Sequence, residues 1–301
     1  MSNKPIAVIT GATSGLGELV AVQLAMCGYN LILTARSMER AAATRKRIYE
    51  HAPSAQVDVF YGDLSVMRDV VRVGNEIANA HPRIDVLLNN AGIHAFEPRI
   101  TSEGLPEMMA VNYLAPWLLT HLLRPSLQKT GTARVVNVAS EASRRHGVLT
   151  LPDDLTDTTP FTARGSSAIY GKTKLLNIMF TAELARQWTG TGIHVNALNP
   201  GFNVTGLGRE LKYAGIIEQI LRFLRLGNPQ KGAAIITRLI MDPEFSSVTG
   251  GYFNVGSGKS IKPAEPGGNV KLQKKLWQAT QELLIEHGYL QSHVQVKLHQ
   301  H

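Results

Sequence analysis

The chain has 301 residues, of which 44% are hydrophobic and 18% are charged, and it carries a net charge of +8 with a pI near 9.6. This apolar content is sufficient for a sizeable buried core. The lysines and arginines are scattered and are not interleaved with aromatic residues, which argues against a nucleic-acid groove; an anionic cofactor or an acidic membrane surface is a better match for the charge.

The single cysteine, Cys27, excludes an intrachain disulfide and fits a reducing compartment. Because it follows Leu24, Ala25 and Met26, we expect it to be a small buried residue. No apolar stretch reaches the roughly 18 residues of a spanning helix, and Met1 leads into a strand-like run without a signal peptide. We therefore expect a cytoplasmic protein whose contact with membranes is at most peripheral.

Short apolar runs alternate with amphipathic stretches along the chain. Strands are predicted at residues 6–10, 30–35, 57–61, 84–88, 134–138 and 193–198, and helices at 16–26 and 67–80, among others. Alternating strands and helices indicate parallel pairing with right-handed crossovers. The nearly continuous apolar strands are typical of a sheet covered on both faces. The fold class is therefore α/β, with one doubly wound, Rossmann-type parallel sheet and helices on both faces.

No linker divides the chain, so we expect a single dinucleotide-binding catalytic domain over residues 1–301. The polar segment 149–167 is predicted to be an insertion loop. A Pro- and Gly-rich loop at 262–269 precedes a C-terminal helical appendage at about 269–287. Four leucines lie roughly on one face of that helix with Trp277 beside them, namely Leu272, Leu276, Leu283 and Leu284.

A glycine-rich turn, Thr10-Gly11-Ala12-Thr13-Ser14-Gly15-Leu16-Gly17, joins the first predicted strand to the first predicted helix. Glycines let a backbone turn tightly beside a pyrophosphate, and the helix N-terminus offers free N–H groups and a partial positive charge. Its place between a strand and an apolar helix favours cofactor binding over an ordinary tight turn. The predicted cofactor residues here are Gly11, Thr13, Ser14, Gly15, Leu16 and Gly17.

The residue that follows the second strand indicates which nicotinamide is bound. An acidic residue at this place holds the ribose 2′-hydroxyl of NAD, whereas an arginine accommodates the 2′-phosphate of NADP. The strand ends at Ala35-Arg36, and no carboxylate appears before Glu39. Arg36 offers a charge-assisted fork to a phosphate, with Arg40 as a second cation. We predict NADP(H), the alternative being that Arg36 is a solvated surface residue.

Tyr170 and Lys174 lie four residues apart, which places them on one face of a helix. Reducing a carbonyl requires a hydride at carbon and a proton at oxygen, and a free phenol with a pKa near 10 exchanges protons poorly at neutral pH. A neighbouring ammonium, together with oxidised nicotinamide, favours the phenolate and lowers that pKa. Taken alone, this pair also fits a structural role.

Two further residues support catalysis by this pair. Ser140 ends the fifth predicted strand at the edge of the sheet where α/β proteins bind ligands, so it is expected to hydrogen-bond the substrate carbonyl. Ser143 is the alternative, but it lies past the strand end. Asn112 is the second residue, and a family resemblance described below gives it a role in catalysis. Because it precedes Pro116 by four residues, the alternative is a polar residue that bends a helix.

The spacing TGxxxGxG, the segment Asn89-Asn90-Ala91-Gly92 and the Tyr-x-x-x-Lys pair together resemble the short-chain dehydrogenase/reductase family. The resemblance covers residues 10–205 and assigns Asn112, Ser140, Tyr170 and Lys174 as a catalytic tetrad, with Asn112 supporting a water-mediated proton relay to the lysine. It places Asp63 and Leu64 by the adenine, and Asn90, Ala91 and Gly92 along the ribose, while Asn89 ties strands together. In Pro200-Gly201-Phe202-Asn203-Val204-Thr205, the backbone and Thr205 would hold the nicotinamide carboxamide; Asn203 stands where many members have valine.

The last third of the chain bears on the substrate. Residues 249–253 are predicted to form the last strand, and with Leu276-Trp277 they resemble the retinol-dehydrogenase-like and WW-domain-oxidoreductase-like branch, which implies a bulky carbonyl. The apolar pattern of residues 211–226, within a segment at about 206–230, predicts a lid helix over the substrate or, alternatively, a helix packed on the core.

The loop between Ser140 and Tyr170 is expected to form a pocket wall. Its aspartates, Asp153, Asp154 and Asp157, have no His or Glu partner for a metal and are expected to be solvated. His94 and His146 are expected to be structural or exposed, the alternative being that they face the pocket.

The sequence thus predicts an NADPH-dependent oxidoreductase that reduces a ketone or aldehyde, or oxidises the alcohol, on a bulky apolar small molecule such as a retinoid, steroid, lipid or polycyclic carbonyl. One alternative is a pathway-specific ketoreductase of polyketide or other aromatic natural-product biosynthesis. An alternative of another class is a catalytically silent NADP-binding regulatory protein. The resemblance also allows a homodimer or homotetramer.

Overall fold

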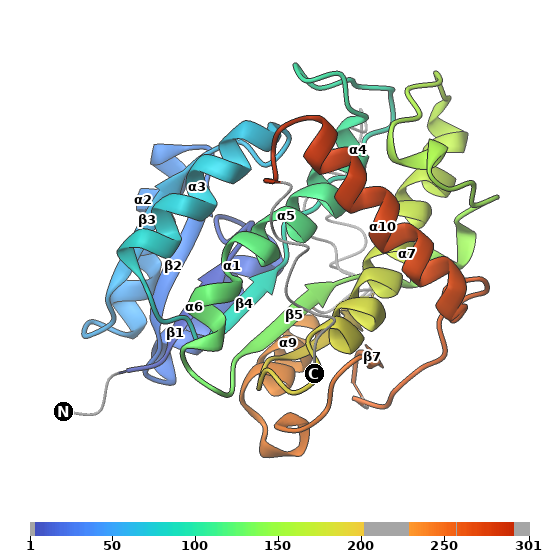
Figure 1. Ribbon diagram of the computed structural model, residues 1–301. Helices are drawn as coiled ribbons and strands as arrows, with labels where there is room; N and C mark the ends of the chain where they lie inside the picture. Colours follow the sequence, from blue (N-terminus) through green and yellow to red (C-terminus); the bar gives the residue numbers. More distant parts are fainter. Residues whose placement is uncertain (1–3, 202–228, 257, 292–301) are drawn as a thin grey trace, which may run out of the picture.

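The computed structural model describes residues 4–201, 229–256 and 258–291. Its strands pair in parallel in one seven-stranded sheet, in the order β3-β2-β1-β4-β5-β6-β7 (Figure 1). This confirms the predicted doubly wound α/β sheet. The strands are β1 (Ile6–Ile9), β2 (Asn30–Ala35), β3 (Val57–Tyr61), β4 (Val86–Asn89), β5 (Arg134–Val138), β6 (His194–Asn199) and β7 (Tyr252–Asn254).

The bounds of β2, β3 and β5 agree with the prediction, whereas β4, β6 and β7 begin later than expected. Ile84 and Asp85 approach the sheet before β4 begins: the backbone N–H of Ile84 donates to Ser126 O, and that of Asp85 donates to Ile6 O. At β7, Gly250 has a φ of +78°, a left-handed conformation that interrupts an extended run. Apolar sequence alone therefore overestimated the N-terminal reach of these strands.

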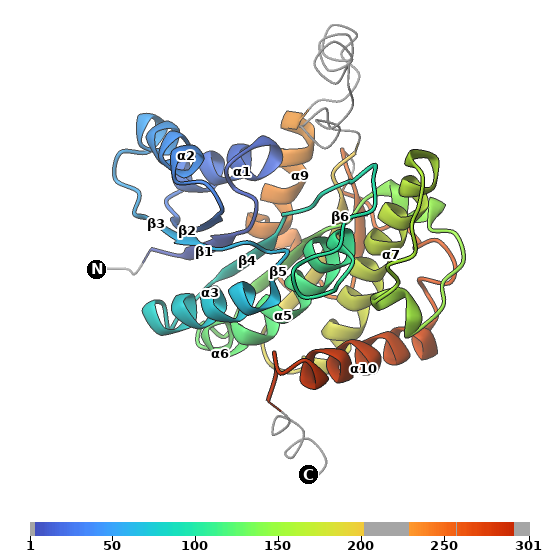
Figure 2. The same ribbon diagram turned by 90° about the horizontal axis from the view of Figure 1, so that it is seen from above.

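Helices cover both faces of the sheet, as Figure 2 shows. α1 (Gly15–Met26), α2 (Met38–His51) and α9 (Pro229–Met241) lie on one face, and α3 (Met67–Ala80), α5 (Ala115–Leu122) and α7 (Ala163–Gln187) lie on the other. Because successive strand residues point to opposite faces, Val8 belongs to one buried cluster and Ile9 to the other. The shorter elements include α6 (Arg124–Gln128) and the 3-10 helix η4 (Pro243–Phe245).

A wide helical turn interrupts the helix that precedes β5. α4 (Glu107–Met109) continues into a π-helical turn, η1 (Ala110–Leu114), and then into α5. Pro116 has no N–H to donate to the Asn112 carbonyl one turn earlier, and Asn177 Nδ2 of α7 donates to that oxygen at 2.7 Å. The proline therefore loosens the helix at Asn112.

The C-terminal helix α10 (Val270–Glu286) packs across the outer sides of α5 and α7 (Figure 2). Asn269 caps its N-terminus by accepting hydrogen bonds from the backbone N–H groups of Lys271 and Leu272. Buried Leu276 and Leu284 face the molecule as predicted, and the Trp277 ring lies 5.3 Å from that of Trp117. The helix thus completes a second layer over one face of the sheet.

Two expectations about single residues are wrong. Cys27 is exposed, because it follows the last residue of α1, where the chain turns through Gly28 at a φ of +89°. Asp154 is buried, because its carboxylate forms an ion pair with Lys172 of α7 and accepts from the Thr150 N–H at 2.6 Å. It lies in the short 3-10 helix η3 (Asp153–Leu155), which thereby joins the insertion loop to α7.

Across the part of the chain that the structure covers, no helix combines the length and the apolar character needed to cross a bilayer.

Candidate active site

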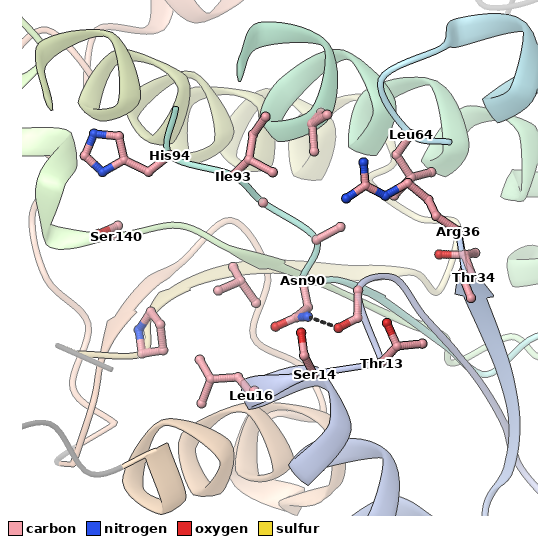
Figure 3. Close-up of a pocket in the computed structure, with 18 of the residues that line it drawn as sticks. Thr13, Ser14, Leu16, Thr34, Arg36, Leu64, Asn90, Ile93, His94 and Ser140 are labelled. Carbon is pink, nitrogen blue, oxygen red and sulfur yellow. Dashed lines mark hydrogen bonds between the residues drawn. The ribbon is translucent and has the colours of Figure 1, made fainter. Parts of the chain in front are cut away.

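A cavity of about 470 Å³ opens at the C-terminal edge of the sheet (Figure 3). Its lining follows the ends of β1, β2, β4, β5 and β6, the edge at which open α/β sheets bind ligands. It brings together most of the predicted site residues, namely Gly11, Thr13, Ser14, Gly15, Leu16, Arg36, Arg40, Asp63, Leu64, Asn90, Ala91, Gly92, Ser140, Tyr170, Lys174, Pro200 and Gly201. Gly17 and Asn112 lie outside this lining. Asn203, Thr205 and the predicted lid at 206–230 fall outside the described residues, except for its last two positions, which belong to α9.

The glycine turn after β1 is shaped by positions that exclude a side chain. Gly11 has a φ of +64°, and a Cβ at this position would lie 2.9 Å from the Ala91 Cα. A Cβ on Gly17 would lie 2.4 Å from the Gly11 carbonyl oxygen and 2.5 Å from Asn90 Nδ2. The turn and the first turn of α1 therefore fold back tightly on one another. The backbone of this turn thus forms a concave surface, called the glycine cradle below, that an added methyl group at either glycine would fill.

Asn90 supports that turn through its side chain. Its Nδ2 donates to Thr10 O at 2.9 Å and to Gly11 O at 3.2 Å, and Figure 3 shows it directed at the turn. Thr10 Oγ1 in turn accepts from the backbone N–H groups of Asn90 and Ala91. Asn89 instead donates to Asn137 Oδ1 of β5 at 2.8 Å and to Thr120 Oγ1, so it ties neighbouring elements together.

The N-terminus of α1 faces this cavity. Ser14, the residue before the helix, has extended backbone and makes no side-chain capping hydrogen bond. The first N–H groups of a helix have no partner within it, and together with the helix dipole they favour an anion. The twelve-residue helix and the glycine cradle therefore form a suitable site for a pyrophosphate.

Arg36 lies at the opposite end of the cavity from Ser140 (Figure 3). Its guanidinium lies 3.6 Å from the Asp63 carboxylate, and its side chain is 63% exposed. Arg40, in the first turn of α2, also lines the cavity, and its backbone N–H donates to Ser37 Oγ. Two cations thus flank the place where sequence and topology put the adenosine ribose.

Lys174 projects from α7 into the end of the cavity that lies opposite Arg36. Its Nζ donates to the Val138 carbonyl at the end of β5, at 2.9 Å, and it lies 5.7 Å from the centre of the Tyr170 ring. Burial lowers the pKa of Lys174 to about 8, because a buried ammonium loses its hydration. Gly92 makes room for it, since a Cβ there would lie 3.2 Å from Nζ.

Tyr170 hydrogen-bonds Ser140 within this cavity. Burial raises the pKa of Tyr170 to about 12, and the hydrogen bond with Ser140 acts in the lowering direction. The pKa shift therefore has the opposite direction to the one expected from Tyr170 and Lys174 alone. The physical reason is that desolvation of the phenolate outweighs the hydrogen bond with Ser140, while Lys174 directs its ammonium at the Val138 carbonyl.

Asn112 is buried beside the site, where its side chain holds the segment after β4. Its Oδ1 accepts from the Ile93 N–H at 2.8 Å, and its Nδ2 donates to Ile93 O at 2.8 Å and to Thr173 Oγ1 at 3.1 Å. In this arrangement the amide braces backbone and α7. Its relay role stays a prediction. Ser143, the alternative hydroxyl, is 1% exposed and is not among the residues that line the cavity.

His94, expected to be structural or exposed, lines the cavity beside the Tyr170 ring. His146, in contrast, pairs with the Glu265 carbonyl oxygen through Nε2. Among the described residues, the lining includes Ser140 and Tyr170 but none of residues 141–169. The expectation that this loop forms a pocket wall is therefore not met.

The sequence analysis did not predict eight further residues of the lining, which flank the motifs without belonging to them. They are Thr34, Ala35, Ser37, Gly62, Ile93, Val111, Val138 and Ala139.

Comparisons with known proteins agree with this arrangement. Residues 5–151 match the family model of the short chain dehydrogenases. The chain is 30% identical to human retinol dehydrogenase 13 over 285 residues, which cover 92% of this chain and 83% of the relative. It is 31% identical to DnrU of Streptomyces sp. strain C5, whose name describes a daunorubicin C-13 ketoreductase, over 91% of this chain and 90% of the relative.

The fold also matches solved structures. An uncharacterised protein from Mycobacterium paratuberculosis superimposes with a TM-score of 0.72 at 26% identity, covering 93% of this chain and 92% of that one. The match covers nearly the whole length of both chains, so the similarity extends beyond residues 5–151, which the family model matches.

Proposed function

The chain belongs to the short-chain dehydrogenase/reductase family, and we propose that it is an NADPH-dependent enzyme that reduces a ketone or aldehyde on a bulky apolar substrate. Family membership makes it an oxidoreductase that acts on CH–OH or C=O groups with a nicotinamide cofactor. The NADP preference, the reductive direction and the substrate class are the parts we propose. We propose further that residues 1–301 act as one catalytic domain.

The described residues fit such a cofactor. The glycine cradle and the N-terminus of α1 would hold the pyrophosphate, Asp63 and Leu64 the adenine, and Lys174 the nicotinamide ribose. Pro200 and Gly201 line the cavity and would lie beside the nicotinamide, where Asn203 and Thr205 would follow them along the chain. When bound, the reduced nicotinamide supplies the hydride.

Tyr170 would supply the proton to the carbonyl oxygen. With its pKa raised to about 12, the phenol is protonated at neutral pH, so it is ready to donate in the reductive direction. Ser140 would hydrogen-bond the same oxygen and orient the carbonyl. Lys174, buried and with a pKa near 8, would favour the tyrosinate that forms as the proton leaves.

Arg36 is the basis for proposing NADPH. An exposed guanidinium at the end of β2 can pair with a 2′-phosphate through two parallel hydrogen bonds. Asp63, 3.6 Å away, would orient the guanidinium before the cofactor arrives. Arg40 places a second positive charge at this end of the cavity.

The substrate class is proposed from the apolar lining of the cavity and from the names of two relatives. Ile93, Val111, Val138 and Ala139 contribute apolar lining to the cavity. Retinol and daunorubicin, named for two relatives, are both large apolar or polycyclic molecules. A retinoid, steroid, lipid or polycyclic carbonyl therefore matches the proposal.

The observation that carries the proposal is that Tyr170, Ser140 and Lys174, from α7 and the end of β5, meet in the cavity that the glycine turn borders. We expect Tyr170→Phe to lower kcat by at least about a thousandfold, because it removes the proton donor, and to leave the Kd for NADPH within about twofold. NADPH oxidation with retinal, a steroid ketone and a polycyclic quinone measures the first quantity. Quenching of protein fluorescence by NADPH measures the second.

A matched variant is Tyr289→Phe, which removes a phenol hydroxyl at the end of α10, away from the cavity lining. It should turn over like the wild type. Retained activity in Tyr170→Phe would refute the proton-donor role. NADPH binding without turnover of any carbonyl by the wild type would instead favour the catalytically silent regulatory protein.

A second candidate function is a pathway-specific ketoreductase of aromatic natural-product biosynthesis, which the similarity to DnrU favours. The two candidates differ in substrate. An anthracycline ketone that turns over with a kcat/KM at least about tenfold above that of retinal would favour this second function.

A further inference from the structure

We propose that His94 is a positioning residue that holds the phenol ring of Tyr170 in the orientation needed for proton transfer. This inference rests on the proposed function. His94 follows Gly92 by two residues, after β4, and lines the same cavity as Tyr170, Ser140 and Lys174. Figure 3 shows it at the Ser140 end of the cavity, away from Arg36.

The imidazole lies flat against the phenol. The centres of the His94 and Tyr170 rings are 4.7 Å apart, and their planes differ by 14°. This is the distance of a stacked aromatic pair. The stack limits rotation of the phenol about its Cα–Cβ bond, which sets where the hydroxyl points relative to Ser140. The same flat contact also hinders rotation about the Cβ–Cγ bond, by which the ring flips.

A hydrogen bond from α7 fixes the imidazole itself. His94 Nε2 lies 3.1 Å from Ser166 Oγ, and that hydroxyl donates to the Ala163 carbonyl at 2.7 Å. Since a hydroxyl has a single hydrogen, the bond to His94 must have Nε2–H as its donor. Ser166 is fully buried and lies one turn before Tyr170 on the same helix, so a single helix anchors both rings.

A third ring supports the imidazole from its own segment. Phe96 lies 4.5 Å from the His94 ring centre at an angle of 31°. The three rings form a short ladder that reaches Tyr170. A flat ring at position 94 would therefore carry the positioning effect, and the hydrogen bond to Ser166 would fix that ring in place.

The test compares His94→Ala with His94→Phe. Alanine removes the stacked ring, whereas phenylalanine keeps a flat ring and loses only the bond to Ser166. We expect His94→Ala to lower kcat roughly tenfold to a hundredfold, because small misplacements of a catalytic group have costs of that size. KM for a small aldehyde and the Kd for NADPH should stay within about twofold, and His94→Phe should recover most of kcat.

His51→Ala is the matched control, because His51 is an exposed histidine of α2 whose ring hydrogen-bonds the Arg47 carbonyl, away from Tyr170 and the cavity. Its kcat, its KM and its Kd for NADPH should match those of the wild type. A kcat for His94→Ala within about twofold of the wild type would overturn the proposal. So would a His94→Phe variant as impaired as His94→Ala, since the ring would then have no positioning effect.

A second measurement does not depend on turnover. Fluorotyrosine, labelled beside the hydroxyl, gives a fluorine resonance for Tyr170 that Tyr170→Phe identifies by its loss. In the wild type and in His94→Phe we expect the ring to flip slowly, so that its two orientations give two resolved fluorine resonances. In His94→Ala we expect faster flipping, which averages them to one resonance. Identical line shapes in the wild type and His94→Ala would overturn the positioning role even if no substrate is found, whereas absence of turnover by the wild type counts against the proposed function alone.

Discussion

In the proposed function, the charge of a single side chain, Arg36, would decide the choice of cofactor. Replacing it with alanine removes the guanidinium that would face a 2′-phosphate. We expect Arg36→Ala to raise KM for NADPH about tenfold and to change KM for NADH by less than about twofold. Steady-state rates with both cofactors measure this ratio.

Arg47→Ala is the control for that experiment, because Arg47 pairs with Glu18 at 2.7 Å and is absent from the cavity lining. It should leave both Michaelis constants unchanged. An equal rise of both constants in Arg36→Ala would mean that Arg36 has no part in choosing the cofactor.

Lys174, which we propose takes part in catalysis, is expected to destabilise the fold through the burial of its ammonium. Burial depresses its pKa from 10.5 to about 8, so the unfolded chain binds more protons than the folded chain between these values. Stability therefore rises with pH across this window, and below pH 8 the buried ammonium destabilises the fold by its full amount, at most about 3 kcal/mol. We expect Lys174→Met to abolish turnover and to raise the free energy of unfolding at pH 7 by about 1 to 3 kcal/mol.

Lys172→Met provides the contrast, because it lies on the same helix but pairs with the buried Asp154. Its loss leaves a carboxylate buried without its cation and should lower the free energy of unfolding, by about 1 to 3 kcal/mol. Urea denaturation at several pH values measures both variants. A Lys174→Met protein less stable than the wild type at pH 7 would contradict the destabilising role of the ammonium.

At the scale of elements, the contact between α7 and the 3-10 helix η2 (Glu141–Arg145) places Ser140 beside Tyr170. Ser140 is the N-cap of η2, and its Oγ accepts from the Ala142 N–H. Gly171 permits this approach, because a Cβ there would lie 2.4 Å from the Ala142 carbonyl oxygen and 3.1 Å from the Arg145 backbone. Backbone atoms on both sides leave no flexible group to move aside.

We therefore expect Gly171→Ala to push η2 away from α7, to lower kcat about tenfold and to reduce stability by about 1 to 3 kcal/mol. Gly165→Ala is the matched control on the same helix, because its nearest contact would be an ordinary 3.6 Å. It should keep the wild-type kcat and stabilise the helix by up to about 1 kcal/mol. Equal kcat values for the two variants would show that the close approach of η2 does not govern the site.

At the scale of the whole molecule, α10 covers apolar surface that α5 and α7 present away from the sheet. Tyr113 of η1, which leads into α5, hydrogen-bonds Thr280 of α10 at 2.8 Å, and Leu276 is 1% exposed. We expect Leu276→Ala to lower the free energy of unfolding by about 2 to 5 kcal/mol, through lost burial and the cavity that remains. KM for NADPH should not change, because α10 contributes no residue to the cavity lining.

Gln278→Ala, on the exposed side of α10, should alter stability by less than about 0.5 kcal/mol. Chemical denaturation compares the two variants. Similar stability of Leu276→Ala and the wild type would mean that α10 is not part of the cooperative unit formed by the sheet and its helices.

The sequence by itself determined the sheet, the glycine turn and the pairing of Tyr170 with Lys174. These features follow from short spacings: alternation of strands and helices, glycines beside a helix start, and residues one helical turn apart. Chain geometry fixes such relations within a few residues, so no knowledge of distant contacts is needed. The bounds of β2, β3 and β5 agree for the same reason.

Only the tertiary structure decided which distant segments meet. His94 and Ser166 are 72 positions apart, and Asp154 reaches Lys172 across the insertion loop, yet nothing in the spacing of either pair marks a contact. The pKa of Tyr170 depends in the same way on burial, because burial sets the free energy of the charged phenolate. The residues next to Tyr170 in the sequence do not reveal how deeply it is buried. Desolvation and contact are properties of the packed molecule, since they arise from every segment that surrounds a group and not from its place in the chain.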